Sequence, residues 1–476
     1  MPYEIDPHIF RAYDIRGDVR TQLTEEAAQA IGAALSASHF PAGSTLVVGQ
    51  DARLSSSGLS QALVEGLLRQ GVNVVCLGQV TTPMLYFALF ERAFDGGIMV
   101  TGSHNPVYDN GFKICRGRES FVGEDIQRVY QKTLEPQAPA AQRGNLTTWN
   151  VFEKYADAIH SRVFPGRPLK LVVDTGNGVA GPFVERVLAP YAQNLEMMYG
   201  DPDGRFPHHH PDPSDAKNMV DCQTRVHETH ADLGLALDGD GDRLGVVDST
   251  GCLIPADRLL TLFAREILAR RRGATILGDV KCSQTTFDDI AQRGGVPCMV
   301  KTGHALIKAK IRETQAAMAG EMSGHFFFED RWFGFDDAIY AAARLCEIVA
   351  RLPEGQSLSD ALSDLPPAVA TPEIRVECPD AFKFDLVREM YNRYKERFPT
   401  SDLDGARIDF PQGWALVRAS NTQPVIVVRI EAQSRPSVTE LSEALLRDLE
   451  DISCAHGVRI DLSPVEHAVR NLPDDV

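Results

Sequence analysis

The sequence lacks the features that mark membrane, secreted and disulfide-bonded proteins. No apolar run approaches the roughly 20 residues of a membrane-spanning helix. The opening residues, MPYEIDPHIF, contain neither the basic nor the apolar segment of a secretory signal. The 9 cysteines form no C-x-x-C pair, which favours reduced thiols over a disulfide framework. We therefore expect a cytoplasmic protein with no membrane partner.

Basic residues are also in the minority. Lys and Arg number 48 against 65 Asp and Glu, which leaves a formal net charge of −17. Such a surplus of negative charge repels the phosphates of nucleic acid and the anionic surface of a membrane, so neither is expected as a partner. A small anionic substrate is compatible with this charge, provided that basic side chains converge at one site.

The chain of 476 residues is too long for a single hydrophobic core. Its first three quarters alternate short apolar runs with amphipathic segments, which is typical of strand–helix–strand units with largely parallel sheets. The layout occurs three times. An opening strand at STLVVGQD, LKLVVDTG or ATILGDV is followed later by a strand that ends in a polar loop, at GIMVTGSHNP, LGLALDGDGDR or AAMAGEMSGH. This repetition predicts three related α/β domains.

The last quarter has a different pattern. The stretch ARIDFPQGWALVRASNTQPVIVVRIEAQ alternates apolar and polar residues, which predicts an antiparallel sheet in a small α+β domain. Pro-rich or polar stretches divide the chain into domains of residues 1–150, 151–254, 255–367 and 368–476. The final segment, LSPVEHAVRNLPDDV, carries no functional motif and is interpreted as a loosely packed terminus.

The loop LALDGDGDR places Asp238, Asp240 and Asp242 at every second position. In extended backbone this spacing puts the carboxylates on one side, and the glycines between them let the loop tighten around an ion. Clustered carboxylates need a cation, and Mg²⁺ is favoured where a phosphate completes the shell. A calcium EF-hand is excluded because Arg243 stands at its glycine position and Ser249 at its final glutamate position. An acidic solvated turn is the remaining alternative.

A second candidate is Ser103, at which the strand-like run of GIMVTGSHNP ends. Its surroundings do not match the G-x-S-x-G frame of a hydrolase nucleophile. Ser103 is instead suited to carry a phosphoryl group whose oxygen completes the Mg²⁺ shell of the aspartate loop. Pro106 keeps Asn105 out of a helix and holds the loop open. Judged alone the segment is more typical of a capped polar turn, but the aspartate loop favours the functional interpretation.

Two further loops carry polar groups that suit a sugar phosphate. In GEMSGH, the alternating Glu321, Ser323 and His325 can face one cavity and hydrogen-bond sugar hydroxyls. In VRASNTQP, a guanidinium with nearby hydroxyls and backbone N–H groups suits a phosphate dianion. The side chains of this second loop are Arg418, Ser420, Asn421 and Thr422. Each loop taken alone is equally well explained as an ordinary polar turn.

Two other features are interpreted as structural. The three consecutive histidines of PHHHPDP (207–213) point in different directions in an extended chain, so no metal site is predicted there. Cys115 and Cys282 lie near the motifs in the sequence, but neither has a neighbour that would mark a nucleophile, and simple packing explains both.

The loops VTGSHNP, DGDGDR, GEMSGH and RASNTQP, in this order and spacing, resemble those of the α-D-phosphohexomutases, and within them bacterial phosphomannomutase/phosphoglucomutase. The segments FRAYDIRG, NGFKI, DVKCS, KTGHALIK and RWFGFDDAIY extend the resemblance over nearly the whole chain. It implies three related α/β domains with mixed sheets plus a C-terminal α+β domain, arranged around a central cleft. In order, these domains would carry the phosphoserine, metal-binding, sugar-binding and phosphate-binding loops.

The resemblance also implies a role for each matched residue. The catalytic residues would be the phosphoserine Ser103, Arg243, Lys113, His304 and His104. Mg²⁺ would be held by Ser103, Asp238, Asp240 and Asp242. The substrate would contact Tyr13, Arg16, Lys281, Glu321, Ser323, His325, Arg418, Ser420, Asn421 and Thr422. Gln423 and the segment GQDAR (49–53) depart from the family pattern beside matched positions and leave the implied mechanism untouched.

The expected activity is that of a phosphohexomutase, an isomerase that interconverts hexose 1-phosphate and hexose 6-phosphate. Phospho-Ser103 would donate its phosphoryl group to the free hydroxyl of the substrate. The resulting hexose 1,6-bisphosphate, both intermediate and activator, would turn around and return its other phosphate. Lys113, His304 and His325 are all candidates for the general acid/base. We expect a monomer that acts on phosphorylated mannose and glucose.

Three alternatives stay open. Met322 favours the mannose and glucose subclass, because phosphoglucosamine mutases, the nearest alternative, commonly have glutamine there. A Mg²⁺-dependent phosphatase can use the same aspartates, but the sugar-binding and phosphate-binding loops favour transfer over release to water. A non-catalytic sugar-phosphate-binding regulator is the alternative from a different class, and substitution of Ser103 separates it from an enzyme.

Overall fold

The computed structural model describes residues 5–353, 355–420 and 423–472. These residues separate into two compact units. The first covers the chain up to residue 276 together with residues 304–362, and the second covers residues 277–303 and the chain from residue 363 onward. The serine and aspartate loops therefore belong to the first unit, and the loop that begins at Arg418 belongs to the second.

The first unit begins with a seven-stranded sheet of order β1-β5-β4-β2-β3-β7, with β6 paired to β5. Its strands are β1 (Ile15–Asp18), β2 (Thr45–Gln50), β3 (Asn73–Gln79), β4 (Gly96–Val100), β5 (Asp109–Arg116), β6 (Glu119–Ser120) and β7 (Leu146–Thr148). The helices between them are α1 (Glu25–Ser38), α2 (Ser56–Arg69), α3 (Thr82–Glu91) and α4 (Glu124–Thr133). Strand β2 is parallel to β3 and β4, whereas β5 is antiparallel to β4 and β1. The sheet is mixed, as predicted.

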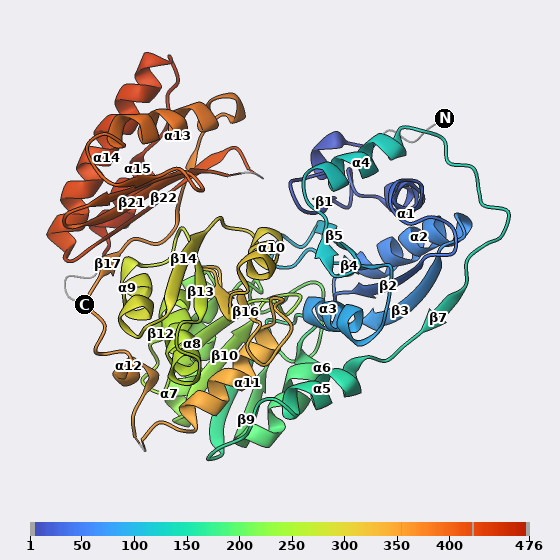
Figure 1. The fold of residues 1–476 in the computed structure, drawn as a ribbon, viewed down its shortest axis with the longest axis horizontal. Coiled ribbons are helices and arrows are strands. Elements are labelled where there is room, and N and C mark those ends of the chain that lie inside the picture. Colours follow the sequence, from blue (N-terminus) through green and yellow to red (C-terminus); the bar gives the residue numbers. More distant parts are fainter. Residues whose placement is uncertain (1–4, 354, 421–422, 473–476) are drawn as a thin grey trace. The chain divides into compact units, whose positions relative to one another are not determined.

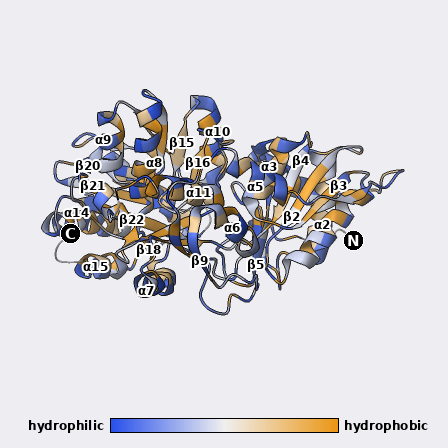
Figure 2. Cartoon of the chain, turned by 90° about the horizontal axis from the view of Figure 1, so that it is seen from below, coloured by the Kyte–Doolittle hydropathy of each residue, from blue (hydrophilic) through white to orange (hydrophobic). Residues whose placement is uncertain are grey.

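The central strands of this sheet are buried on both faces. Leu46 and Val48 of β2 belong to the same core as apolar residues of α1 and α2. The alternate residue Val47 points to the opposite face, where α3 packs, because successive side chains of a strand alternate. Figure 1 shows α1 and α2 side by side, and in Figure 2 the strands β2 and β3 are largely hydrophobic. This burial explains the nearly continuous apolar runs in the sequence.

The second sheet of this unit has five strands in the order β12-β11-β10-β8-β9. The strands are β8 (Leu169–Asp174), β9 (Ala192–Met198), β10 (Leu233–Leu237), β11 (Leu244–Asp248) and β12 (Leu253–Ile254), with helices α5 (Phe152–His160), α6 (Gly181–Leu188) and α7 (Val220–Thr229). Strand β8 is parallel to β9 and β10, whereas β10 and β11 form an antiparallel pair. The aspartate loop connects β10 to β11, at the carboxyl edge of β10.

The remaining elements before the C-terminal sheet lie in both units. The first unit contains α8 (Ala256–Arg270), α10 (His304–Thr314), the antiparallel strands β15 (Met318–Gly320) and β16 (Phe326–Phe328), α11 (Ala338–Val349) and α12 (Leu358–Ala361). Strand β13 (Thr275–Asp279) carries the chain into the second unit, which contains α9 (Gln284–Gln292) and β14 (Val296–Val300). The GEMSGH loop connects β15 to β16.

The second unit contains a six-stranded antiparallel sheet of order β17-β22-β21-β20-β19, with β18 paired to β22. The strands are β17 (Val369–Ala370), β18 (Ile374–Glu377), β19 (Thr400–Ser401), β20 (Ala406–Phe410), β21 (Gly413–Ala419) and β22 (Val425–Ala432). Helices α13 (Asp380–Tyr394) and α14 (Arg435–Ala455) contribute apolar residues to its core. The predicted C-terminal α+β fold is confirmed. No helix in the described part of the chain is both long and apolar enough to cross a bilayer.

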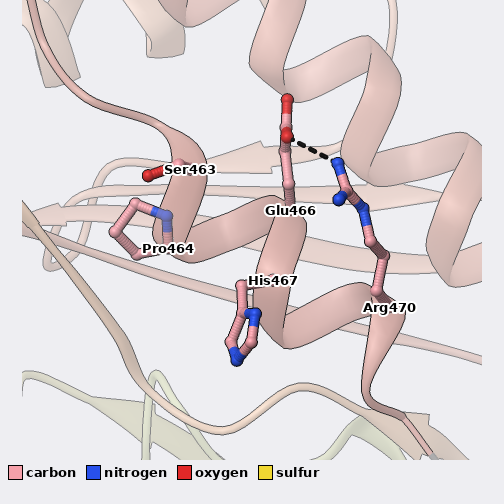
Figure 3. A pocket seen from close by; sticks show the side chains of 5 residues that line it. All are labelled: Ser463, Pro464, Glu466, His467 and Arg470. Carbon is pink, nitrogen blue, oxygen red and sulfur yellow. Dashed lines mark hydrogen bonds and ion pairs between the residues drawn. The ribbon is translucent and has the colours of Figure 1, made fainter.

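The prediction of a loosely packed terminus is wrong. Residues 463–470 form helix α15 (Ser463–Arg470), and Val465 and Val469 are buried in the core of the C-terminal sheet. Their spacing of four residues places both on one helix face. On the exposed side Glu466 and Arg470 form an ion pair of 2.9 Å beside a shallow hollow (Figure 3). The apolar pair, which the sequence does contain, is the signal for this helix.

An aromatic cluster joins three parts of the first unit. Its members are Phe87 and Phe90 of α3, Tyr155 of α5, the loop residues Trp332, Phe333 and Phe335, and Tyr340 of α11. At its centre the buried Asp337 carboxylate accepts hydrogen bonds from Tyr155 Oη at 2.8 Å and Trp332 Nε1 at 3.1 Å. Burial raises the pKa of Asp337 to about 7, although these hydrogen bonds favour the ionised form.

The raised pKa of Asp337 predicts a pH-dependent stability. The unfolded chain ionises this carboxyl above its ordinary pKa of 3.8, whereas the folded chain keeps it protonated up to about pH 7. Its contribution to stability is therefore complete at low pH and falls as the pH rises to about 7, by at most about 1.4 kcal/mol per pH unit. We expect Asp337→Asn to gain stability relative to the wild type between about pH 5 and about pH 7.

Thermal unfolding followed by tryptophan fluorescence checks this expectation. The control is Asp203→Asn, because contacts with Arg205 lower the pKa of Asp203 to about 2, outside the tested range. Parallel pH profiles for the wild type and Asp337→Asn would contradict the assignment.

Candidate active site

The aspartate loop is wound around one of its own carboxylates. Asp238 Oδ1 accepts hydrogen bonds from the backbone N–H groups of Asp242 at 3.0 Å and Arg243 at 3.1 Å. Gly241 has φ +76, a left-handed conformation that glycine adopts without strain. As a result Asp238, Asp240 and Asp242 each present a carboxylate oxygen within 4.8 Å of the others, and all three residues are fully buried.

Ser103 lies directly against this loop. Its Oγ donates a hydrogen bond of 2.8 Å to Asp238 Oδ2, across a separation of 135 residues in the chain. The two backbones also touch, since a Cβ added at Gly239 would lie only 2.5 Å from the Ser103 carbonyl oxygen. Ser103 itself has φ +48, an unusual conformation for a residue other than glycine. The structure thus brings the predicted hydroxyl and the predicted carboxylates together.

The carboxylates are suited to hold a metal ion. Asp240 Oδ1 is buried and accepts no hydrogen bond, a costly arrangement for a charged oxygen that a cation would relieve. Asp242 Oδ1 also lacks a well-aligned hydrogen bond, and His325 Nε2 lies 3.3 Å from it. Burial, together with the facing Asp242 and Asp240, raises the pKa of Asp238 well above its ordinary value. A set of carboxylate oxygens with an adjacent serine hydroxyl fits a hard divalent cation such as Mg²⁺.

Lys113 provides positive charge beside the same carboxylates. Its Nζ lies 2.7 Å from Asp240 Oδ2 and 2.6 Å from Asp242 Oδ2. Burial disfavours the ammonium, but the two carboxylates outweigh that cost and raise the pKa of Lys113. Lys113 is therefore a fixed cation at neutral pH. It lies on β5, which is antiparallel to the strand that leads into Ser103.

The GEMSGH loop meets the aspartate loop through His325. Its Nδ1 lies 3.0 Å from Glu321 Oε2 and 2.9 Å from Ser323 Oγ, and its Nε2 lies 3.3 Å from Asp242 Oδ1. Burial opposes a charged imidazole, but Asp242 and Glu321 raise the pKa of His325 to about 9. The three predicted sugar-binding side chains are therefore neighbours.

The pKa of His304 is shifted in the opposite direction. It opens α10, and its ring packs edge-on against the ring of Tyr13 with 5.4 Å between centroids. Burial, together with the nearby cations Lys308 and Lys113, holds the pKa of His304 well below its ordinary value. The imidazole is therefore neutral at neutral pH, and its Nδ1 lies 3.6 Å from Asp336 Oδ2.

His104 and Arg16 complete the surroundings of the serine. His104 Nδ1 lies 3.1 Å from Ser103 Oγ, and burial with the nearby Arg243 and Arg16 keeps the pKa of its imidazole well below the ordinary value. Arg16 donates to Asn105 Oδ1 at 2.5 Å and pairs with Asp14 at 3.0 Å. Both predicted residues therefore contact the serine loop.

The remaining predicted residues lie in the second unit. Lys281 pairs with Glu373 at 2.5 Å, and Arg418 donates to Asp404 at 2.7 Å. Ser420 directly follows β21. Asn421 and Thr422, the other two predicted phosphate-binding residues, lie outside the described residues.

Sequence reasoning missed several residues that contact the site. Thr82 Oγ1 donates to Asp240 Oδ2 at 2.6 Å, and Lys308 lies 3.3 Å from Asp336, whose carboxylate is fully buried. Arg53 and His210 contact the backbone of the serine loop. Arg53 and Asp336 lie inside quoted motifs, GQDAR and RWFGFDD, which could have identified them. Thr82 has no motif around it, and its role follows only from the fold.

Comparison with known proteins agrees with this site. The family models for phosphoglucomutase/phosphomannomutase match the chain at residues 7–138 (alpha/beta/alpha domain I), 153–251 (domain II), 255–369 (domain III) and 373–447 (C-terminal domain). The phosphomannomutase/phosphoglucomutase of Pseudomonas syringae pv. tomato is 42% identical, over 94% of this chain and 96% of that protein. A phosphoglucomutase of Neisseria meningitidis serogroup A is 40% identical, over 91% of this chain and 95% of that protein.

A solved structure is similar over the same extent. A phosphoglucomutase/phosphomannomutase family protein from Burkholderia thailandensis is 41% identical, with a TM-score of 0.88 over 96% of this chain and all of that one. The α/β fold, together with a serine that faces three carboxylates, defines an enzyme of the phosphohexomutase class. The chain belongs to the phosphoglucomutase/phosphomannomutase family. The predicted family, fold class and enzyme class are confirmed.

The buried carboxylate set predicts that Mg²⁺ stabilises the folded chain. A ligand that binds only the folded state at about 100 times its dissociation constant adds about 2.7 kcal/mol. We expect a rise in Tm on titration with MgCl₂ after treatment with EDTA. Asp240→Asn and Asp242→Asn should lose most of this rise, whereas Asp203→Asn, whose carboxylate is bonded by Arg205, should keep it. An equal rise in all four proteins, measured by differential scanning fluorimetry, would contradict binding at this loop.

Proposed function

We propose that the chain is a phosphohexomutase that interconverts the 1-phosphates and 6-phosphates of mannose and glucose through a phosphoserine at Ser103. The observation that carries this proposal is the 2.8 Å hydrogen bond from Ser103 Oγ to Asp238 within the buried three-carboxylate loop. A hydroxyl held at a divalent-cation site is suited to phosphoryl transfer. The names of the relatives from Pseudomonas syringae and Neisseria meningitidis support the same activity.

In the proposed first step, the bond between phosphorus and Ser103 Oγ breaks while a bond forms to the free hydroxyl oxygen of the substrate. The product is a hexose 1,6-bisphosphate, and Ser103 is left as the alcohol. Mg²⁺, held by Asp238, Asp240, Asp242 and a phosphoryl oxygen on Ser103, would supply charge neutralisation at the transferring group. Lys113 supplies a permanent positive charge beside it, and Arg243, at the end of the same loop, supplies a second.

The proton of the attacking hydroxyl needs an acceptor, and it returns to Ser103 Oγ when transfer is complete. Lys113, His304 and His325 are the three proposed candidates for this work. Burial and the nearby Lys308 hold the pKa of His304 well below its ordinary value. A neutral imidazole can accept a proton, which supports His304 as the proposed acceptor.

The second step is the reverse transfer, from the other end of the bisphosphate to Ser103. The sugar must bind in both orientations, so its contacts have to use features that the two orientations share. Glu321, Ser323 and His325 are proposed to hold sugar hydroxyls, with Tyr13 and Arg16 as further substrate contacts. The proposed binding site for the phosphate that does not react comprises Lys281, Arg418, Ser420, Asn421 and Thr422. In this proposal each of the domains 1–150, 151–254, 255–367 and 368–476 contributes one loop.

The phosphoserine assignment predicts a mass shift and a loss of turnover. Incubation with glucose 1,6-bisphosphate should add one phosphate to the wild-type chain, mapped to Ser103 by tandem mass spectrometry. Ser103→Ala should bind no phosphate covalently and should lose nearly all conversion of glucose 1-phosphate. Ser323→Ala, which removes a serine from the sugar loop, should still be phosphorylated at Ser103. A stable adduct on another residue, or full turnover by Ser103→Ala, would contradict the proposal.

The subclass predicts a preference among sugars. A site that recognises features common to both binding orientations has little means to discriminate at the 2-position, so mannose and glucose should be converted with similar kcat/KM, within about tenfold, or about 1.4 kcal/mol. Coupled assays with mannose, glucose and glucosamine 1-phosphates measure this ratio. A clear preference for glucosamine 1-phosphate would instead assign the chain to the phosphoglucosamine mutases.

A further inference from the structure

The backbone carbonyls of the serine loop are held by two side chains from elsewhere in the first unit. We propose that Arg53 and His210 are positioning residues, which fix the phosphoserine loop through its carbonyl oxygens and so align Ser103 with the aspartate loop. The inference rests on the proposed phosphohexomutase function. It also gives a role to the histidine run, PHHHPDP, that no catalytic or binding assignment uses.

The guanidinium of Arg53 contacts the serine loop directly. Its Nη2 donates to the carbonyl oxygens of Ser103 at 2.8 Å and Asn105 at 2.5 Å, and its Nη1 donates to those of Pro106 at 2.6 Å and Asp109 at 2.8 Å. A single planar guanidinium thus spans four carbonyls of one loop. Arg53 is 3% exposed, so water does not compete for these bonds.

Asp51 ties the base of the same loop to Arg53. Its Oδ2 accepts hydrogen bonds from Thr101 Oγ1 at 2.8 Å and from the backbone N–H of Gly102 at 3.1 Å, and it lies 3.5 Å from Arg53 Nε. A Cβ at Gly102 would lie 2.4 Å from Arg53 Nε, so the guanidinium fits only because this residue is glycine. The carboxylate holds the N–H side of the loop while the guanidinium holds its carbonyl side.

His210 reaches the one carbonyl between Ser103 and Pro106 that Arg53 does not hold. Its Nε2 contacts the backbone carbonyl oxygen of His104. Because a carbonyl only accepts, His210 must carry its proton on Nε2 and donate it. His210 lies 106 residues further along the chain, in the part that carries the aspartate loop. Its hydrogen bond therefore links the serine loop to a different sheet.

The other two histidines of the run anchor the backbone around His210. His209 Nε2 lies 3.0 Å from Asp174 Oδ2, and His208 Nδ1 lies 2.7 Å from Asn177 Oδ1. Asp174 ends β8 and Asn177 follows it, so both anchors belong to the sheet that carries the aspartate loop. The three side chains therefore have three different partners, and only that of His210 belongs to the serine loop.

The same segment also contacts the aspartate loop. A Cβ at Gly239 would lie 3.4 Å from Pro211 Cγ, and Asp212 lies 3.7 Å from the Arg243 guanidinium. Segment 208–212 is therefore placed between the loop that carries the phosphoryl group and the loop proposed to bind the metal. Its contacts fix their separation at the point where the two backbones touch.

This arrangement matters because phosphoryl transfer depends on position. Ser103 has a left-handed backbone conformation, φ +48, that a side chain rarely adopts without external support. Displacement of a reacting group by about 1 Å can cost about 100-fold in rate. Loss of either positioning contact should therefore lower kcat with little change in KM, because neither side chain needs to touch the substrate.

The test compares two substitutions of His210. His210→Phe keeps a ring but removes the donor, and we expect kcat for glucose 1-phosphate to fall about 10- to 100-fold with KM within about threefold of wild type. His210→Gln places an amide N–H near the position of Nε2 and should recover most of kcat. His227→Ala, at an exposed histidine in the last turn of α7, is the control and should keep kcat within about twofold.

Arg53 is tested in the same way. Arg53→Met should lower kcat at least as far as His210→Phe, and Arg53→Lys should recover only part of it, because an ammonium cannot span four carbonyls. Arg205→Met, at an exposed arginine of the first unit, is the matched control. Circular dichroism and Tm report whether the Arg53 variants fold, and the His210 pair decides the proposal if they do not.

The outcomes separate this inference from the proposed function. Suppose that the wild-type chain is phosphorylated at Ser103 by glucose 1,6-bisphosphate and that His210→Phe has the same kcat as the wild type. The positioning role is then wrong, and the mutase function stands. An equal loss in His210→Phe and His210→Gln would also overturn it, because the donor would then be irrelevant. A wild-type chain that is neither phosphorylated nor active overturns the proposed function itself.

Discussion

Three buried carboxylates that face a single serine hydroxyl set the constraint on which the rest of the site depends. A buried ion without a partner costs on the order of several kcal/mol, and Asp240 retains one buried oxygen that accepts no hydrogen bond. Lys113 compensates part of the charge, and a divalent cation is the natural compensation for the rest. The serine is held where such a cation and a phosphoryl group would meet.

The charged groups of the site shift the pKa values of two histidines in opposite directions. Asp242 and Glu321 raise the pKa of His325 to about 9, whereas burial and the nearby Lys308 and Lys113 hold the pKa of His304 well below its ordinary value. The two rings are near-parallel neighbours with 6.1 Å between centroids. Two neighbouring rings with pKa values shifted in opposite directions are what the proposed proton transfer would use.

Support for the site extends well beyond the groups that would touch a substrate. Asp51 and Arg53 hold the two sides of the serine loop, and segment 208–212 joins that loop to the aspartate loop. The aromatic cluster around Asp337 joins α3, α5 and α11 within the same unit. The first residue of α3, Thr82, bonds Asp240. Helix α3 therefore contacts both the aromatic cluster and the aspartate loop.

The sequence by itself determined the chemistry of the loops. Apolar runs that end in Ser103, Asp238 or Glu321 predicted strands with polar ends, and the order of four motifs identified the family. The alternating pattern after residue 400 predicted the antiparallel sheet. Helix α15 was misjudged because its apolar pair, Val465 and Val469, is short and its burial depends on a sheet formed elsewhere in the chain.

Only the tertiary structure decided which atoms meet. The contact of Ser103 with Asp238 spans 135 residues, and that of His210 with His104 spans 106. Every residue has the same backbone carbonyl, so a sequence pattern does not identify which carbonyls accept hydrogen bonds from Arg53 and His210. The charge states of His304 and His325 were equally hidden, because they depend on which cations and carboxylates the fold places beside each ring. Residue type determines which chemistry a side chain can perform. The packing of strands and loops determines which atoms that side chain contacts.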